Sequence, residues 1–496
     1  MFQFNQLSQN IIYTTFTTFM KVKSPLLYLL FFTVSLNTSI VVNARVKLPS
    51  LFTNNMVLQQ KSDVAIWGWA QEAANVSVVT SWDNKHYNTK TDSKGNWKLK
   101  VNTPAAGGPY NITISDGSAV VLKNVLIGEV WLCSGQSNME MPMKGYNGQP
   151  VLGSNMAILK SKNKNIRLFT VAHSGKTEPQ QDVAGTWEEA SPETVANFSA
   201  TGYYFARLLN ETLGVPIGMI NTSFGGSSIE TWMTPSSLQP FDNVKIPKKG
   251  ESISLYRSPA VLYNGMLAPI AGYGIKGSLW YQGEGNYDKP DEYEKLFPAM
   301  VKEWRSLWNI GDFPFYYAQI APYNYTIFTP GNWATKYNSA YLRDAQRKAL
   351  QTIPNSGMAV LLDIGEENLI HPANKEAGGT RLAYLALAKT YGLKGFGAAS
   401  PSVDSITVKG STAILTFKDA ANGLTSFGKP ISHFEIAGFD KKFYPAKAAI
   451  NKAVVSVSAP EVKEPVAVRY AFKDFVVGDL FSTEGLPVSS FRTDDW

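Results

Sequence analysis

The sequence predicts an α/β protein in which a mostly parallel sheet lies between helical layers and is flanked along the chain by two β modules. Between residues 127 and 399, short apolar strands alternate with helical stretches, the order that builds a parallel sheet with helices on both faces. Residues 45–126 and 400–496 instead run in short alternating segments separated by turn residues, as in small β-sandwiches. A chain of 496 residues is long enough for two or three such domains.

Residues 1–44 have the features of a secretory signal peptide. A basic pair, Lys21 and Lys23, precedes an apolar stretch, and small residues ending at Ala44 supply a cleavage site. Either Met20 is the true start or an atypical extension precedes it. We expect a secreted or periplasmic protein with no membrane segment after cleavage, since no later segment approaches eighteen uninterrupted apolar residues.

Charge and composition exclude several classes of function. The net charge of +7 is spread without a long basic run and gives no indication of a nucleic-acid partner. The chain has no metal-ligand cluster, phosphate loop or nucleotide fingerprint, so we expect no metal and no cofactor. The single cysteine, Cys133, excludes an internal disulfide, and its place in an apolar strand predicts a buried, inert thiol.

The individual elements follow from the period of the apolar residues. Strands of the first β module are predicted at 64–69, 76–79 and 97–101. In the middle region, helices are predicted at 201–212, 293–307, 340–352 and 375–391, and strands at 217–221, 275–281, 315–320 and 359–363. Strands of the last module are predicted at 405–408, 412–417, 433–437 and 466–471.

A tight polar turn follows the apolar strand that opens the middle region. Its sequence, Gly-Gln-Ser-Asn at 135–138, presents one hydroxyl at the carboxyl end of a sheet, where ligands of open α/β folds bind. Ser137 is therefore a candidate nucleophile. No second glycine follows the serine, so this turn is not the Gly-x-Ser-x-Gly elbow of the α/β-hydrolases.

A serine nucleophile needs a base, and the chain has four histidines. His86 and His433 fall in the β modules, and His173 lies in a loop with no acid close by in the sequence. His371 follows the last strong strand and precedes a helix, which predicts a position at the sheet edge that carries Ser137. There an imidazole can take the serine proton and return it to the leaving alcohol.

Acyl transfer also needs donors aimed at the developing oxyanion. Gly225 and Gly226 follow one strand and let backbone N–H groups approach a ligand closely. A second glycine-rich turn carries Gln282 and Glu284 after another strand. Each loop alone is a common strand-to-helix connection. The serine turn and these two loops in chain order, followed by His371, indicate a catalytic site at one edge of the sheet.

Four sequence blocks carry a resemblance to a known family. They are Gly-Gln-Ser-Asn at 135–138, Gly-Gly at 225–226, Trp-Tyr-Gln-Gly-Glu at 280–284 and His-Pro-x-Asn-Lys at 371–375. They resemble the successive blocks of the sialate O-acetylesterase-like proteins, carbohydrate acetylesterases of the SGNH hydrolase superfamily. With the segments at 55–59 and 484–496, the resemblance covers essentially the whole chain after residue 44.

The resemblance implies an SGNH α/β/α domain at 127–399 and a serine esterase that removes O-acetyl groups from a carbohydrate. Sialic acid is the expected substrate, and acetylated plant polysaccharide is the alternative. Ser137 is implied as the nucleophile and His371 as the base. The implied oxyanion and substrate-binding groups are the N–H of Ser137, a backbone N–H at Gly225 or Gly226, the Gln282 side chain and Asn138.

The third catalytic residue stays open. Many SGNH enzymes place an aspartate three residues before the histidine, where this chain has Asn368. Asp363, at a predicted strand end, is the first candidate. Asn368 could accept the ring N–H instead, and a Ser137–His371 dyad is the third possibility. We interpret Glu284 as a hydrogen-bonding residue that fixes its loop.

Two other classes compete with an esterase. A glycosidase would use paired carboxylates, for example Glu284 and Asp363, but it would leave the serine turn and His371 unexplained. A non-catalytic carbohydrate-binding protein would suit the β modules and the 12 tryptophans. Arg343, in a predicted helix, could bind a sialate carboxylate, although a helical arginine more often forms a surface salt bridge.

Overall fold

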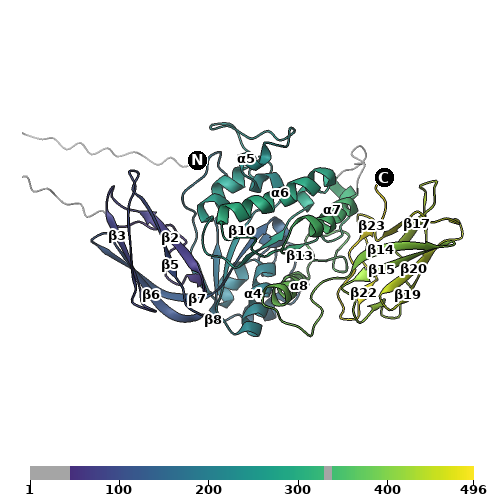
Figure 1. The fold of residues 1–496 in the computed structure, drawn as a ribbon, viewed down its shortest axis with the longest axis horizontal. Helices are drawn as coiled ribbons and strands as arrows, with labels where there is room; N and C mark the ends of the chain where they lie inside the picture. The colour runs from purple at the N-terminus through teal and green to yellow at the C-terminus, as the bar shows by residue number, and fades with distance from the viewer. Residues whose placement is uncertain (1–44, 329–337) are drawn as a thin grey trace, which may run out of the picture. The chain divides into compact units, whose positions relative to one another are not determined.

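In the computed structural model, which describes residues 45–328 and 338–496, the middle of the chain forms a mostly parallel sheet covered by helices on both faces (Figure 1). The predicted signal peptide at 1–44 lies outside the described residues. In spatial order the strands are β13 (Ser356–Ala359), β12 (Phe315–Ala318), β11 (Gly277–Tyr281), β7 (Ala119–Gly135), β10 (Ile217–Ser223), β8 (Asn163–Thr170) and β9 (Trp187–Ala190). Only the β8–β9 pair is antiparallel. The predicted fold class is confirmed.

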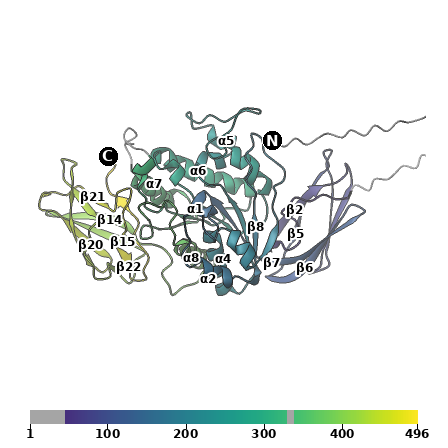
Figure 2. The same ribbon diagram turned by 180° about the vertical axis from the view of Figure 1, so that it is seen from behind.

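Both faces of this sheet are buried, which explains why its strands are apolar throughout. Along β7, Cys133 belongs to one apolar core and Leu132 to the other, as the two-residue period of a strand requires. The helices α4 (Ala200–Leu213) and α8 (Lys375–Leu385) cover the first core, and α6 (Pro290–Trp308) and α7 (Ser339–Thr352) cover the second. In both views α4 and α8 lie side by side (Figures 1 and 2).

The predicted helices begin within three residues of their expected starts, and the last of them continues beyond Leu385 as a π-helix, Ala386–Thr390. The last strand predicted in the middle region is displaced. The strand expected at 359–363 is observed as β13, which ends at Ala359, and Asp363 lies in a turn beyond it. Val360, Leu361 and Leu362 are buried without joining the sheet. An apolar run alone does not distinguish a paired strand from a buried connection, so the prediction for this strand was wrong.

The N-terminal β module shares a strand with the central sheet. The first half of β7 pairs with β6 (Gly107–Ser115) and β1 (Val57–Gln59), and its second half with β10 and β11 (Figure 2). The remaining strands are β2 (Asp63–Trp69), β3 (Asn75–Thr80), β4 (His86–Lys90) and β5 (Asn96–Asn102). The boundary expected at residues 126 and 127 therefore falls inside one continuous strand.

The C-terminal module contains two four-stranded antiparallel sheets. One is formed by β14 (Ser402–Lys409), β15 (Thr412–Lys418), β20 (Val454–Ser458) and β19 (Lys447–Asn451). The other is formed by β18 (Phe443–Pro445), β17 (Phe434–Ala437), β21 (Ala467–Tyr470) and β23 (Phe491–Arg492). Over the described part of the chain, the search for a helix of membrane-spanning length and hydropathy finds none.

Candidate active site

Ser137 stands where β7 turns sharply into the four-residue helix α1 (Ser137–Glu140). Gly135 makes this turn possible, since its φ is 137° and a Cβ there would lie 2.1 Å from the carbonyl oxygen of Tyr281. The N–H of Gln136 donates to the same carbonyl at 2.9 Å, so β11 holds the turn against the sheet. The hydroxyl-bearing residue that follows is therefore presented from a rigid strand end.

A cavity of about 900 Å³ opens at this edge of the sheet. It brings together Ser137, His371, Gly225 and Gly226, four residues that the sequence predicted for the site. Aromatic and charged side chains complete much of its wall: Tyr146, His173, Phe224, Tyr287, Tyr325, Glu140, Arg257, Glu284 and Asp288. The mixture of aromatic surfaces and convergent polar groups is typical of a site for a polar organic ligand.

His371 is half-buried in this cavity and is held by an amide rather than by an acid. Its Nδ1 lies 2.5 Å from Oε1 of Gln149, and its ring meets the edge of Tyr146 at 5.4 Å between centroids. Since an amide oxygen only accepts, Nδ1 carries the proton and Nε2 is left as the basic nitrogen. Burial, with a smaller contribution from Lys375, lowers the pKa of His371 to about 4, so the ring is neutral at neutral pH.

Gln149 is presented to the imidazole by a tight hairpin. The N–H of Tyr146 donates to the carbonyl of Gln149 and the reverse bond is also made, both at 3.0 Å. Gly148 closes the turn with a φ of 71°, which a side chain would disfavour. The hairpin lies 222 residues before His371, and nothing in the local sequence marks Gln149 as its partner.

A second histidine also lines the cavity, contrary to the interpretation of His173 from sequence. His173 Nε2 lies 3.0 Å from Oε1 of Glu140, and its ring packs 4.4 Å from that of Phe224. The hydrogen bond to Glu140 raises the pKa of His173. Glu140 follows Ser137 by three residues on α1, so the pair lies beside the serine turn, and no local pattern in the sequence marks His173 as its partner. The cavity thus holds one imidazole whose pKa is lowered and one whose pKa is raised.

The two glycines have backbone donors to offer, whereas Gln282 does not reach the cavity. Among the described residues, no acceptor takes a hydrogen bond from the N–H of Gly225 or Gly226. The Gln282 side chain is fully buried, and its Nε2 donates to Ser227 O at 3.0 Å and to Asn286 Oδ1 at 2.8 Å. It ties two loops together, so the structure places it in the scaffold rather than beside Ser137.

Asn138 belongs to a buried network behind Ser137. Its Nδ2 donates to Oε1 of Glu284 at 2.5 Å and to the carbonyl of Ile370 at 3.1 Å, and its Oδ1 accepts from Lys375. All its polar atoms are thus used inside the protein. Because Ile370 directly precedes His371, the network links the serine turn to the histidine loop. Burial lowers the pKa of Lys375 to about 7 and raises that of Glu284.

The structure does not bring Asp363 to His371. Both carboxylate oxygens of Asp363 accept from Arg381, at 2.7 and 2.6 Å. Because the strand ends four residues earlier than predicted, this carboxylate faces α8 instead of the cavity. Asn368 is exposed in the loop before the histidine. Gln149 therefore occupies the position for which the sequence offered Asp363 or Asn368.

Two further residues lie away from the cavity lining. Cys133 is fully buried, and burial raises the pKa of its thiol. Arg343 is also fully buried, and its guanidinium donates to Ser490 Oγ at 3.1 Å and to the carbonyl of Lys473. Neither expectation for Arg343 holds, since it is neither a substrate ligand nor a surface ion pair. It connects α7 to the C-terminal module.

A parallel sheet whose carboxyl edge presents a serine, a neutral imidazole and uncommitted backbone N–H groups has the arrangement of a carboxylic ester hydrolase on an α/β/α fold. Residues 127–383 match the family described as "Carbohydrate esterase, sialic acid-specific acetylesterase". The chain belongs to this family, which confirms the resemblance seen in its sequence.

Similar proteins agree with this assignment. The sialate O-acetylesterases of Homo sapiens and Pongo abelii are each 28% identical to this chain over an alignment of 406 residues that covers 74% of this chain and 75% of theirs. A crystal structure of a carbohydrate acetylesterase from Xanthomonas citri is 34% identical, with a TM-score of 0.82 over 91% of this chain and all of that one. The matched structure thus includes the β modules as well as the catalytic domain.

Proposed function

We propose that the protein is a secreted esterase that removes O-acetyl groups from sialic acid through an acetyl-enzyme intermediate on Ser137. The convergence of Ser137, His371 and the uncommitted N–H groups of Gly225 and Gly226 on one cavity carries the proposal. The signal peptide predicted at 1–44 supports secretion.

In the proposed reaction, Ser137 Oγ attacks the acetyl carbonyl carbon while His371 Nε2 accepts the hydroxyl proton. The carbonyl electron pair moves onto oxygen, and the N–H of Ser137 and a backbone N–H at Gly225 or Gly226 donate to the oxyanion. Collapse breaks the ester C–O bond, and His371 returns the proton to the sugar alcohol. Water then repeats the sequence on the acetyl-serine and releases acetate. Gln149 keeps the imidazole in the required tautomer throughout.

Cationic groups in the cavity support an acidic sugar as substrate. Arg257 lines the wall, and its Nη1 donates to the carbonyl of Gly285 at 2.5 Å. The other N–H groups of its guanidinium can donate to a substrate. His173 offers a second cation when it is protonated beside Glu140. A sialate carboxylate is a suitable partner for either group. The relative from Xanthomonas citri is described only as a carbohydrate acetylesterase, so acetylated polysaccharide stays the alternative substrate.

Acetate release from a panel of substrates tests this function. We expect the highest kcat/KM with O-acetylated sialic acid, a lower value for its carboxyl methyl ester, and labelling of Ser137 by a fluorophosphonate. Faster release from acetylated xylan than from the sialate would assign the polysaccharide instead. Labelling of Ser137 without acetate release from any sugar would contradict a carbohydrate substrate.

The pH profile of kcat/KM for a small aryl acetate is expected to stay level on its acid side down to about pH 5. The reason is the pKa of His371, which burial lowers to about 4, so the base stays neutral above that pH and is lost only as the pH falls through it. A histidine with an ordinary pKa of about 6.5 would already be mostly protonated at pH 5. An acid limb near pH 6.5 in a protein whose folding is verified by fluorescence would contradict the lowered pKa of His371.

Substitutions at Gln149 should reveal its role through the same profile. Gln149→Ala is expected to lower kcat by about tenfold, the effect of one neutral hydrogen bond. Gln149→Glu should move the acid limb to higher pH, because a carboxylate favours the imidazolium. The matched control is Asp363→Asn, which weakens the contact to Arg381 and should leave the acid limb in place. The opposite pattern would return the orienting role to Asp363.

A further inference from the structure

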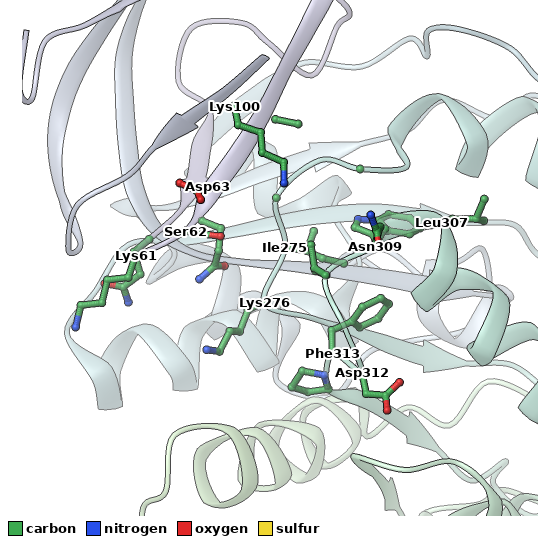
Figure 3. A pocket seen from close by; sticks show the side chains of 18 of the residues that line it. Lys61, Ser62, Asp63, Lys100, Ile275, Lys276, Leu307, Asn309, Asp312 and Phe313 are labelled. Atoms are coloured by element: carbon green, nitrogen blue, oxygen red, sulfur yellow. The ribbon is translucent and has the colours of Figure 1, made fainter. Parts of the chain in front are cut away.

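A second cavity lies at the opposite edge of the central sheet from Ser137 (Figure 3). It has a volume of about 720 Å³ and is bounded by the N-terminal β module and by the segments that lead into the central strands. Lys276 directly precedes β11 and Pro314 directly precedes β12, so both mark the amino edge of the parallel sheet. With about 3.3 Å per residue, the five residues of β11 separate the two edges by roughly 17 Å.

The lining of this cavity is strongly basic. It includes five lysines and two aspartates: Lys61, Lys98, Lys100, Lys276, Lys389, Asp63 and Asp312. Both acids have other partners, since Asp63 accepts from Asn102 at 3.0 Å and Asp312 lies 3.7 Å from Arg305. Lys389 donates to the carbonyl of Ser356 at 2.8 Å. Within 45–328 and 338–496, the other four lysines form no ion pair with any residue.

The lysines approach the cavity from two walls. Lys98 and Lys100 are two residues apart on β5, so both leave the face opposite the buried Trp97 and Val101. Figure 3 shows Lys100 extending from the β module and Lys276 leaving the loop before β11 on the side away from Lys100. Ammonium groups gathered around one concave surface produce a positive potential that attracts an anionic ligand.

An apolar floor accompanies these charges. Ile275, Leu307 and Phe313 line the cavity together with Ile310, which is 47% exposed although it is aliphatic. A sugar ring has the matching chemistry, because its C–H face can pack on apolar side chains while a ring carboxylate reaches a lysine. Inorganic anions have no group that packs on the apolar surface.

We propose that this cavity binds a carboxylate-bearing polysaccharide, a chain of acidic sugars, as a carbohydrate site separate from the one that contains Ser137. Occupation of the cavity would hold the enzyme on a polymer whose acetyl esters are removed at the other edge of the sheet. That consequence rests on the proposed esterase function, whereas the binding itself does not.

Titration of the wild-type protein with an unacetylated oligogalacturonate tests the binding separately from catalysis, because this ligand has no ester to cleave. We expect binding that weakens as salt rises, no binding of the fully methyl-esterified oligomer, and weaker binding of tripolyphosphate, which has no ring to pack on the apolar side chains. Equal binding of the methyl ester, equal binding of tripolyphosphate, or no binding of the oligogalacturonate would overturn the proposal.

Charge-reversal variants locate the site. The pair Lys98→Glu and Lys100→Glu should weaken oligogalacturonate binding at least tenfold and leave turnover of a small aryl acetate unchanged. The pair Lys162→Glu and Lys164→Glu is the control, since these lysines are exposed, have the same spacing and lie outside the cavity. Lys276→Gln, on the opposite wall, should also weaken binding. Equal affinity of the cavity variants and the control pair would overturn the assignment.

Discussion

Replacing Ser137 by alanine is expected to lower kcat for a small aryl acetate by about 10⁴-fold or more, the effect of removing a nucleophile. The hydroxyl has no substitute in the cavity, because the thiol of Cys133 is buried in the strand and lies outside the lining. The substitution removes one oxygen at a partly exposed turn, so the free energy of unfolding should change little. Initial rates and a urea unfolding curve check both expectations.

Cys133→Ser is the matched control for this experiment. It changes the other candidate nucleophile, places a hydroxyl in an apolar strand and should lower stability more than activity. Retention of most activity by Ser137→Ala, together with a total loss in a folded Cys133→Ser protein, would contradict the assignment of the nucleophile. Fluorophosphonate labelling of the two variants gives an independent answer, since only Cys133→Ser should still react.

The sequence could predict the parts of the site that depend on residues adjacent to one another in the chain. The serine turn follows an apolar strand that ends at Gly135. The positive φ that requires glycine at this position is a local property of the backbone. His371 was reached by elimination among four histidines and by its place after the last strong strand. The order of strands and helices likewise follows from periodicity along the chain, which is why the fold class was predictable.

The parts that could not be predicted depend on where side chains point after folding. Gln282 was expected at the oxyanion because a glycine-rich turn follows its strand, but its amide donates to Ser227 on a neighbouring loop and to Asn286 in its own turn. The partner of His371 is Gln149, from a hairpin 222 residues away. A pairing of this kind leaves no periodic or spacing signal in a single sequence.

Asp363 shows a different kind of failure. The prediction placed it at a strand end, and parallel strand ends meet at the catalytic edge. In the structure β13 ends at Ala359, so Asp363 belongs to the connection that follows the strand. Its carboxylate faces Arg381 and accepts a hydrogen bond from it. Strand bounds carry an error of a few residues, and in a strand an error of one residue already reverses the direction of a side chain.

His371→Ala should reduce kcat about as much as Ser137→Ala, because the serine is a weak nucleophile without a base to take its proton. The two residues act as one unit, so the double variant should be no slower than either single one. His173→Gln is the matched control. His173 lines the same cavity, but its Nε2 is already occupied by Glu140 at 3.0 Å, so this nitrogen is not free to take the serine proton.

The control should therefore affect KM for an acidic sugar more than kcat for an aryl acetate. Steady-state rates with both substrates separate the two roles. A double variant much slower than Ser137→Ala alone would show that His371 acts independently of the serine. A loss of about 10⁴-fold in His173→Gln, with His371→Ala close to wild type, would exchange the roles of the two histidines and make the Glu140–His173 pair the catalytic one.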